Sequence, residues 1–409
     1  MKDHIPTKIL ANGALRYGVY DDAGTLVRYE YIKPEDEPSE AGDLLCKATL
    51  LDDNTCTLLS LPNTAVPNSA LQKMILNGKY AFAVTVKTPL GNPISGVTVT
   101  GLTSMSGESA ITDSNGYALG ISSSATPTIS VASPYVDLQN YSATVASTGP
   151  VTSVTAVLAK KATQEIAYTS SASIKFSPDV KDFDACCVGG GGGGGAGQVT
   201  GGSGGGGGNT YNLIAHIAKT DGTSYGVTVG AGGAGGSRDP SASYANITYP
   251  GSGGTSALSE GGTTILSASG GGGASSYYSG STAQSPTYPG SSSNGGSGGK
   301  GGQPDMSEST AGAPGTTYVF NEASKGLTSG GGGGAGACSS WSNSSGKSGG
   351  LPYGGNGANS AGTGQNGKGY GGGGGGGGGI SGTPQSASVA NGGSGAPGAV
   401  IIRWRLKTV

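Results

Sequence analysis

Short alternations of apolar and polar residues recur along the first half of the chain and predict β-strands. Residues 14–31 carry two of them, separated by the turn sequence at residues 21–24. One face of the first strand would hold Leu15, Tyr17 and Val19, and one face of the second Val27, Tyr29 and Tyr31. A hairpin is therefore expected near the N-terminus.

The next segment has helical character. Residues 44–51 form one helix-like run, and a second helix is predicted from Asn68 or Ser69 to a stop at residues 77–78, with a polar cap first and glycine last. With the hairpin they form an N-terminal region, residues 1–78. Because this small α+β unit has little core, we expect it to dock on another protein or to oligomerise.

Residues 79–161 are predicted to form one all-β domain. Turn sequences lie at residues 89–93 and 112–117. Strands are predicted at residues 80–87, 97–100, 128–131, 141–145 and 154–158, and a further strand is predicted to begin at residue 117. Short alternating strands at this spacing are typical of a β-sandwich.

A third region, residues 162–409, mixes strands with glycine. Of 84 glycines, 12 precede Gly189 and the other 72 lie between Gly189 and Gly398, which is why a boundary is placed before them. Some tracts are pure glycine, as at residues 189–195 and 371–379. Apolar strands bracket the tracts at residues 166–168, 185–188, 211–217, 225–229 and 399–404.

Such tracts are either flexible linker or ordered scaffold. Order is favoured, because the embedded strands need a sheet to join and because linkers usually intersperse serine evenly. Ordering glycine costs about 1–2 kcal/mol of backbone entropy per residue, which one net hydrogen bond barely offsets. Several helices of the polyproline II type, packed laterally, would satisfy every backbone group at once. We therefore predict a mainly β protein with a bundle of polyglycine helices closed by β-strands.

Net charge, the length of apolar runs and cysteine spacing argue against several classes of protein. A net charge of −2 gives no basic field for nucleic acid. No apolar run is long enough for membrane insertion, and the N-terminus lacks the apolar stretch of a standard export signal. The five cysteines show no paired metal spacing, and Cys186 and Cys187 are expected on opposite faces of a strand rather than in a disulfide framework. No metal or cofactor is expected.

The middle domain resembles a known family. The sequence of residues 91–99, followed by that of residues 112–118, is similar to the carboxypeptidase-regulatory-like β-sandwich family. That resemblance implies a spacer or adhesion module.

The glycine-rich region resembles a second family. Residues 182–188 with the seven glycines that follow, residues 225–236 and residues 392–404 are similar, in that order, to motifs of glycine-rich domains in phage tail fibres. The predicted architecture is also similar to the polyglycine-helix adhesin that tips the long tail fibres of some T-even-like phages. The resemblance implies a virion protein that binds the host cell surface.

The N-terminal region has a partial resemblance of its own. Residues 44–74 resemble a recurrent segment in tail proteins of phages that infect Gram-positive bacteria, although residues 42–46 depart from the usual sequence before the lysine. This implies attachment to baseplate or tail proteins. A homotrimer and a monomer on a trimeric shaft both remain open.

No catalytic set is evident, so we do not expect an enzyme. His4 lies near the terminus and His216 alternates along a predicted strand. The acids between Gly189 and Gly398 are scattered through predicted loops, without the paired carboxylates of a glycosidase: Asp221, Asp239, Glu260, Asp305, Glu308 and Glu322. Gly-x-Gly-x-x-Gly matches carry no weight in such tracts.

Aromatic residues in the loops between tracts are the candidate binding residues. Their neighbours are rich in Ser, Gly and Asn, the combination found in antibody binding loops. The candidates for contact with a host-surface glycan or protein are Tyr244, Tyr249, Tyr277, Tyr278, Tyr288, Trp341 and Tyr353. The alternative is that these rings pack over the bundle and hold the loops down.

The sequence bears on three possible functions. Host attachment through these loops is favoured, and a structural fibre or virion decoration protein without a receptor is the alternative. Ice binding would require regular Thr-x-Thr or Thr-x-Ala faces, which the irregular loops do not offer.

Overall fold

The computed structural model describes the chain in segments. They are residues 5–9, 15–20, 25–32, 79–149, 151–197, 204–238, 247–274, 310–315, 317–318, 327–328, 331–334, 346–351, 353–359, 362–378 and 390–408. Their regular elements are all β-strands, which confirms a mainly β fold. The helices predicted at residues 44–51 and 68–78 lie outside the described residues. The described part contains no helix long and apolar enough to cross a membrane.

The N-terminal strands form a three-stranded antiparallel sheet in the order β1-β2-β3. The predicted hairpin is confirmed as β2 (Leu15–Tyr20) and β3 (Leu26–Ile32), with Tyr17 opposite Glu30. Strand β1 (Ile5–Ile9) was not predicted. It contains Pro6, which weakens a strand pattern, and its register shifts between Pro6 and Lys8.

The middle domain is a curved seven-stranded sheet in the order β10-β4-β7-β5-β8-β9, with β6 paired to β5. Its strands are β4 (Tyr80–Lys87), β5 (Thr98–Thr103), β6 (Ser109–Ile111), β7 (Tyr117–Ser122), β8 (Thr128–Val131), β9 (Tyr141–Thr144) and β10 (Val151–Val157). Strands β5 and β7 share one residue pair, Thr103 with Ile121. The sheet therefore bends there into two layers around a core that includes Phe82, Val99 and Ile129.

Two four-stranded sheets form the base of the glycine-rich region. One has the order β11-β22-β13-β14 and the other β12-β15-β18-β19. The strands are β11 (Glu165–Tyr168), β12 (Ala172–Lys175), β13 (Val180–Val188), β14 (Tyr211–Ala218), β15 (Ser224–Thr228), β18 (Ser256–Glu260), β19 (Thr263–Ala268) and β22 (Ala399–Leu406). Two further strand pairs lie among the tracts: β16 (Ser237–Arg238) with β17 (Ile247–Thr248), and β20 (Thr317–Tyr318) with β21 (Leu327–Thr328).

An aromatic cluster fills the space between the two base sheets. The ring of Phe176 lies 4.9 Å from that of Phe183, and Phe183 lies 5.1 Å from Tyr225 in an edge-on arrangement. Trp404 is buried against the same cluster. Such pairs stabilise a core beyond their buried area, so the base has a conventional hydrophobic core although the region is rich in glycine.

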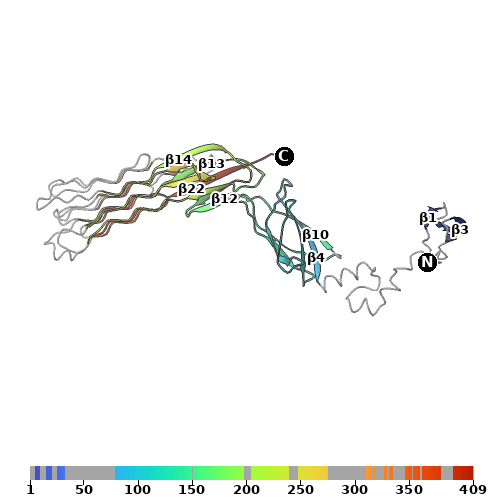
Figure 1. Ribbon diagram of the computed structural model, residues 1–409. Coiled ribbons are helices and arrows are strands. Elements are labelled where there is room, and N and C mark those ends of the chain that lie inside the picture. Colours follow the sequence, from blue (N-terminus) through green and yellow to red (C-terminus); the bar gives the residue numbers. More distant parts are fainter. Residues whose placement is uncertain are drawn as a thin grey trace.

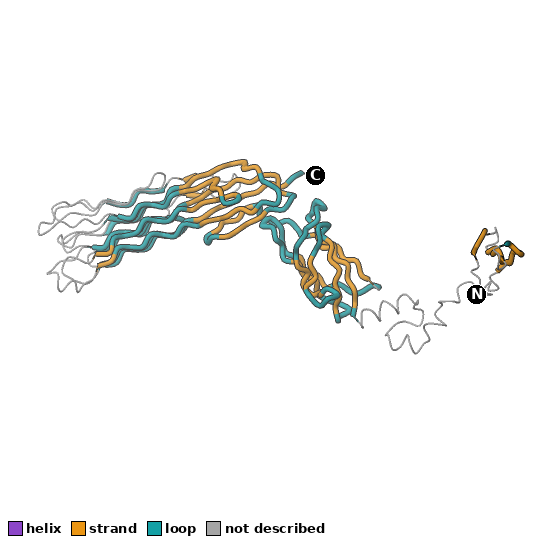
Figure 2. The backbone as a smooth tube through the Cα atoms, in the orientation of Figure 1, coloured by secondary structure: helices purple, strands orange, loops and turns teal. Residues whose placement is uncertain are grey.

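The strands of the base run directly into the glycine tracts, which continue side by side away from the sheets (Figures 1 and 2). Three tracts adjoin β22, β13 and β14, and three adjoin β15, β18 and β19. The tracts beside β22, β13 and β14 are residues 390–398, 189–197 and 204–209, respectively. The tracts beside β15, β18 and β19 are residues 230–236, 251–254 and 270–274, respectively. The sheets therefore fix the starting positions of these six tracts.

The tract at residues 189–197 is hydrogen-bonded on every side. Its amides donate with a period of three: Gly190 N to Gly254 O (2.9 Å), Gly191 N to Ala396 O (2.8 Å) and Gly192 N to Gly207 O (2.8 Å). The next turn repeats these directions toward Gly251, Gly393 and Gly204. Three residues per turn and lateral hydrogen bonds identify a polyglycine II helix.

Its carbonyls bond to three further tracts. Gly271 N donates to Gly190 O, Gly233 N to Gly191 O and Gly374 N to Gly192 O, each at 2.8 or 2.9 Å. Helix 189–197 thus donates to three neighbours and accepts from three others. Neighbouring members of this ring are also hydrogen-bonded to each other, which is hexagonal packing.

A second helix, residues 371–378, has the same environment. It donates to tracts 331–334, 189–197 and 362–368 through Gly373, Gly374 and Gly375. It accepts from tracts 204–209, 353–359 and 390–398. The predicted bundle of laterally bonded polyglycine helices is confirmed, and its centre is two adjacent helices of glycine in which Ala196 is the one other residue.

Close packing explains why these tracts are glycine. A Cβ placed on Gly193 would lie 1.9 Å from Ala234 O, and one on Gly374 would lie 1.9 Å from Gly393 O. Peripheral helices have an open side, and there every third residue is larger. Ala231 and Ala234 of one helix, and Ser394 and Pro397 of another, are exposed. In these two helices, exposed non-glycine residues three positions apart mark the outer face.

The two described cysteines are buried on opposite faces of β13, as predicted. Cys187 belongs to the core between the base sheets, and Cys186 packs on the other face with Val188 and Ile401. Neither cysteine is in a disulfide. Burial raises the pKa of the Cys187 thiol to about 12.

We expect both thiols to resist alkylation in the native protein, because the thiolate is the reactive form and burial suppresses it. Iodoacetamide labelling with peptide mass mapping would show modification of residues 186–187 only in denaturant, which serves as the positive control. Equal labelling in native buffer would contradict the buried placement.

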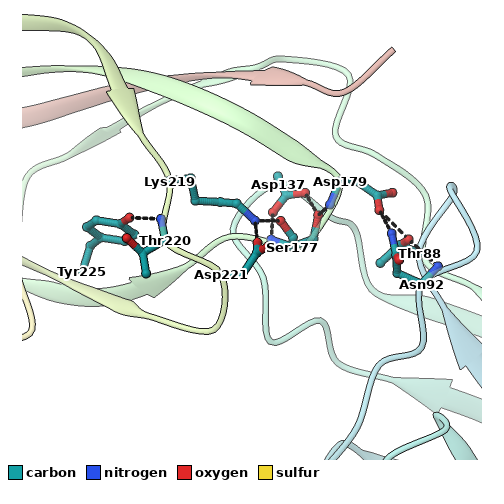
Figure 3. A network of polar contacts seen from close by, with 9 residues as sticks. All are labelled: Thr88, Asn92, Asp137, Ser177, Asp179, Lys219, Thr220, Asp221 and Tyr225. Carbon is teal, nitrogen blue, oxygen red and sulfur yellow. Dashed lines mark hydrogen bonds and ion pairs between the residues drawn. The ribbon is translucent and has the colours of Figure 1, made fainter. Parts of the chain in front are cut away.

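A buried polar joint connects the middle domain to the base (Figure 3). Asp179 accepts hydrogen bonds from Thr88 Oγ1 (2.7 Å), Asn92 Nδ2 (2.8 Å) and the amide of Leu90 (3.1 Å). Thr88 and Asp179 are buried. A carboxylate that satisfies three donors across an interface fixes the position of one unit on the other.

A second carboxylate of the joint comes from the other side of the interface. Asp137 accepts from the amide (2.8 Å) and hydroxyl (2.6 Å) of Ser177, and burial raises the pKa of Asp137 despite these hydrogen bonds. Lys219 Nζ donates to Ser177 O (2.8 Å) and pairs with Asp221. The angle between the middle domain and the bundle (Figure 1) is thus set by reciprocal hydrogen bonds.

Candidate functional site

A polar groove lies on the outer face of the bundle, toward the end remote from the base sheets. Its volume is about 410 Å³. It is lined by Gly346, Lys347, Ser348, Asn356, Gly357, Ala358, Asn359, Gly362, Thr363 and Gln365. Gly362 accepts from Gly378 N, near the end of the central helix, whereas Gly371 bonds to Pro397 beside β22. The groove therefore lies along the distal part of the described lattice.

Three consecutive tracts form the groove: residues 346–350, 353–359 and 362–368. Lys347 O accepts from Gly357 N and Asn356 O from Gln365 N, so each tract is bonded to the next. The middle tract is tied to central helix 371–378 through Gly355 and Ala358. The backbone around the groove is thus held by the lattice rather than by side-chain packing.

Two asparagines one helical turn apart hold the tract at residues 346–350. Asn356 Oδ1 accepts from Gly349 N (2.9 Å), and Asn359 Oδ1 accepts from Gly346 N (2.9 Å). A peripheral helix turns some amides away from the lattice, and these side chains satisfy them. Elsewhere on the surface, Asn366 Oδ1 accepts from Ser394 N (2.9 Å) in the same manner.

Asn356, Asn359 and Lys347 offer hydrogen-bond donors to the groove, and Ser348, Thr363 and Gln365 can both donate and accept. Since Oδ1 of Asn356 and Asn359 is engaged, Nδ2 is what each amide has left, and neither Nδ2 has an acceptor among the described residues. Lys347 is the charged residue in the lining. Across the described residues, no group of three His, Cys, Asp or Glu side chains could hold a metal ion.

The structure places two of the seven predicted binding aromatics. Tyr249 follows β17 and is 66% exposed. Tyr353 is half-buried: a Cβ on Gly369 would lie 2.5 Å from its ring, and its carbonyl accepts from Lys368 N (2.8 Å). Tyr353 therefore packs over the backbone. Tyr244, Tyr277, Tyr278, Tyr288 and Trp341 lie outside the described residues.

His216 belongs to a charged cluster at the edge of the base. Its backbone adopts a positive φ of 56°, which lets its amide donate to Asp184 Oδ1 (2.8 Å). Arg405 bonds to Asp182, Asp184 and His216 Nδ1. Burial opposes ionisation, yet the hydrogen bonds from Arg405 and His216 hold the pKa of Asp184 below its usual range. Each charged group of the cluster therefore has a hydrogen-bond partner within it, which is typical of a structural role.

Sequence reasoning did not single out the groove. The available signal was the Asn-x-x-Asn spacing of Asn356 and Asn359 in a glycine-rich tract, which places both side chains on one face of a three-residue helix. The bonds from Gly346 and Gly349 could not be anticipated, because glycine tracts carry no information on which tract lies beside which.

The comparison with known families agrees with this architecture. The family model of a glycine-rich domain matches residues 167–405, which is more than half of the chain. The chain therefore belongs to the glycine-rich domain family. No curated protein is similar enough in sequence to count as a match.

Proposed function

We propose that this chain is a phage tail-fibre or receptor-binding protein that attaches the virion to the host cell surface. The supporting observation is the lattice itself. Helices 189–197 and 371–378 contain no side chain that could recognise a ligand, with the exception of Ala196, which is buried. Recognition is left to outward residues and to the loops between tracts, as in other scaffolds that carry binding loops.

The fixed joint supports the same proposal. Asp179 and Asp137 hold the middle domain at a defined angle to the bundle, which suits a spacer that presents a binding end away from the particle. In this proposal residues 1–78 join the baseplate or tail proteins. The protein is neither an enzyme nor a nucleic-acid-binding protein, and it acts as part of the virion.

The test is binding of the purified full-length chain, fluorescently labelled, to a panel of Gram-positive and Gram-negative bacterial strains. We expect saturable binding to a subset of strains, and at least about tenfold weaker binding after Tyr277→Ala with Trp341→Ala, since aromatic anchors dominate interface energies. Tyr117→Ala is the matched control, because Tyr117 is an exposed tyrosine of the middle domain.

A structural fibre or decoration protein without a receptor is the alternative. It would give no saturable binding to any strain, including strains that adsorb the phage carrying the gene. Binding that is unchanged in the Tyr277 and Trp341 variant would instead remove the loops around these residues from the interface.

A further inference from the structure

We infer that the groove lined by Asn356 and Asn359 is a binding subsite for a linear N-acetylated glycan. The inference rests on the proposed attachment function and gives it a ligand class.

The hydrogen-bonding groups of the groove favour a ligand that carries acceptors. Asn356 and Asn359 present Nδ2 donors because their Oδ1 atoms are occupied by backbone amides, and Lys347 adds an ammonium donor. The lining contains no carboxylate. These three donors complement a ligand rich in acceptors, and the acetamido carbonyl is the strongest neutral acceptor that a sugar carries. Hydroxyl groups of Ser348 and Thr363 match the sugar hydroxyls.

The spacing of the two asparagines along the helix axis favours a linear glycan. Asn356 and Asn359 are one turn apart on a polyglycine II helix, so their side chains repeat at about 9 Å along the bundle axis. This repeat is close to the length of a disaccharide unit in an extended polysaccharide. A linear glycan parallel to the bundle would therefore meet equivalent donors at equivalent positions.

The side-chain amides of Asn356 and Asn359 are held in place before any ligand binds. The Oδ1 bonds from Gly349 and Gly346 fix both amides, and Ala358 N bonds to Gly376 O of a central helix at 3.0 Å. A site that is ordered before binding loses little entropy when a ligand arrives. This compensates for the absence of an aromatic residue from the lining.

The experiment uses a substitution that separates folding from binding. Asn356→Asp and Asn359→Asp retain the Oδ1 acceptor for Gly349 and Gly346 but remove the Nδ2 donor. Asn366→Asp is the matched control, because Asn366 accepts from Ser394 N in the same way and does not line the groove. Hydrogen exchange at Gly346 and Gly349 reports whether the tracts remain bonded.

The probes are chitohexaose and cellohexaose, titrated calorimetrically against the full chain. We expect chitohexaose to bind more tightly than cellohexaose, and the double Asp variant to lose about tenfold or more in affinity for chitohexaose. The Asn366→Asp variant should bind as the wild type. Absence of chitohexaose binding to the wild type, equal affinity for both probes, or equal loss in the Asn366 control would each overturn the inference.

Cell binding distinguishes this inference from the proposed function. If the double Asp variant still binds cells while the Tyr277 and Trp341 variant does not, the groove is no subsite and the attachment function stands. If the wild type binds chitohexaose, the double Asp variant loses this binding and the wild type binds no cell, the groove binds a glycan and the attachment function fails.

Discussion

Gly193→Ala is expected to disrupt the glycine bundle while the middle domain stays folded. The added methyl group would lie 1.9 Å from Ala234 O, the acceptor for Gly251 N, so neighbouring helices must separate. Gly193 does not have a positive φ, so the effect is one of packing. We expect a loss of roughly 3 kcal/mol or more in the free energy of unfolding of the bundle. Denaturant unfolding followed by hydrogen exchange at residues 189–197 measures it.

Two matched substitutions test this explanation. Gly251→Ala puts the new methyl group 3.2 Å from its nearest neighbour at the edge of the lattice, and Gly149→Ala meets nothing within 4 Å. Both should cost less than about 1 kcal/mol. If Gly193→Ala were as well tolerated as Gly149→Ala, hexagonal close packing around helix 189–197 would be wrong.

Asp179→Ala is expected to release the joint between the middle domain and the bundle. The substitution leaves Thr88 Oγ1, Asn92 Nδ2 and Leu90 N without their acceptor, where Thr88 is fully buried. Buried donors without partners cost about 1–3 kcal/mol each, so we expect a loss of about 3 kcal/mol or more. Amide exchange of Leu90 should increase, whereas exchange in tract 189–197 should not.

Asp113→Ala is the matched control for the joint. Asp113 Oδ1 accepts from the amides of Asn115 and Tyr117, both at 2.9 Å, in an exposed turn of the middle domain. We expect a loss below about 1 kcal/mol, because water replaces the carboxylate. Unchanged Leu90 exchange in Asp179→Ala would show that other contacts hold the interface.

The strands and the polyglycine helices were predictable because their signals are local. Strand β4 follows an apolar alternation, and the energetics of residues 371–379 require lateral hydrogen bonding. Strands β18 and β19 were missed because their Ser- and Thr-rich sequences hold few apolar residues. Strand β6 was missed because it has three residues.

The order of helices in the lattice could not be predicted. Strand register is encoded by side chains, but Gly192 and Gly374 present identical surfaces to any partner. For the six tracts that adjoin base strands, the order follows from the order of the strands in the two sheets, whereas helix 371–378 adjoins no base strand. Outward positions such as Ala231 and Ala234 do carry information, because only a helix with an open side tolerates a Cβ at every third residue.

The continuity of β13 and β22 with helices 189–197 and 390–398 has a mechanical consequence. Tension applied at the distal end runs along the helix axes, at right angles to the hydrogen bonds between neighbours, and so loads many of them in shear together. Bonds loaded in parallel share the force, whereas bonds opened in sequence each bear it alone. The same force then crosses the interface at Asp179 and Asp137, where far fewer bonds share it, so rupture under tension should begin there.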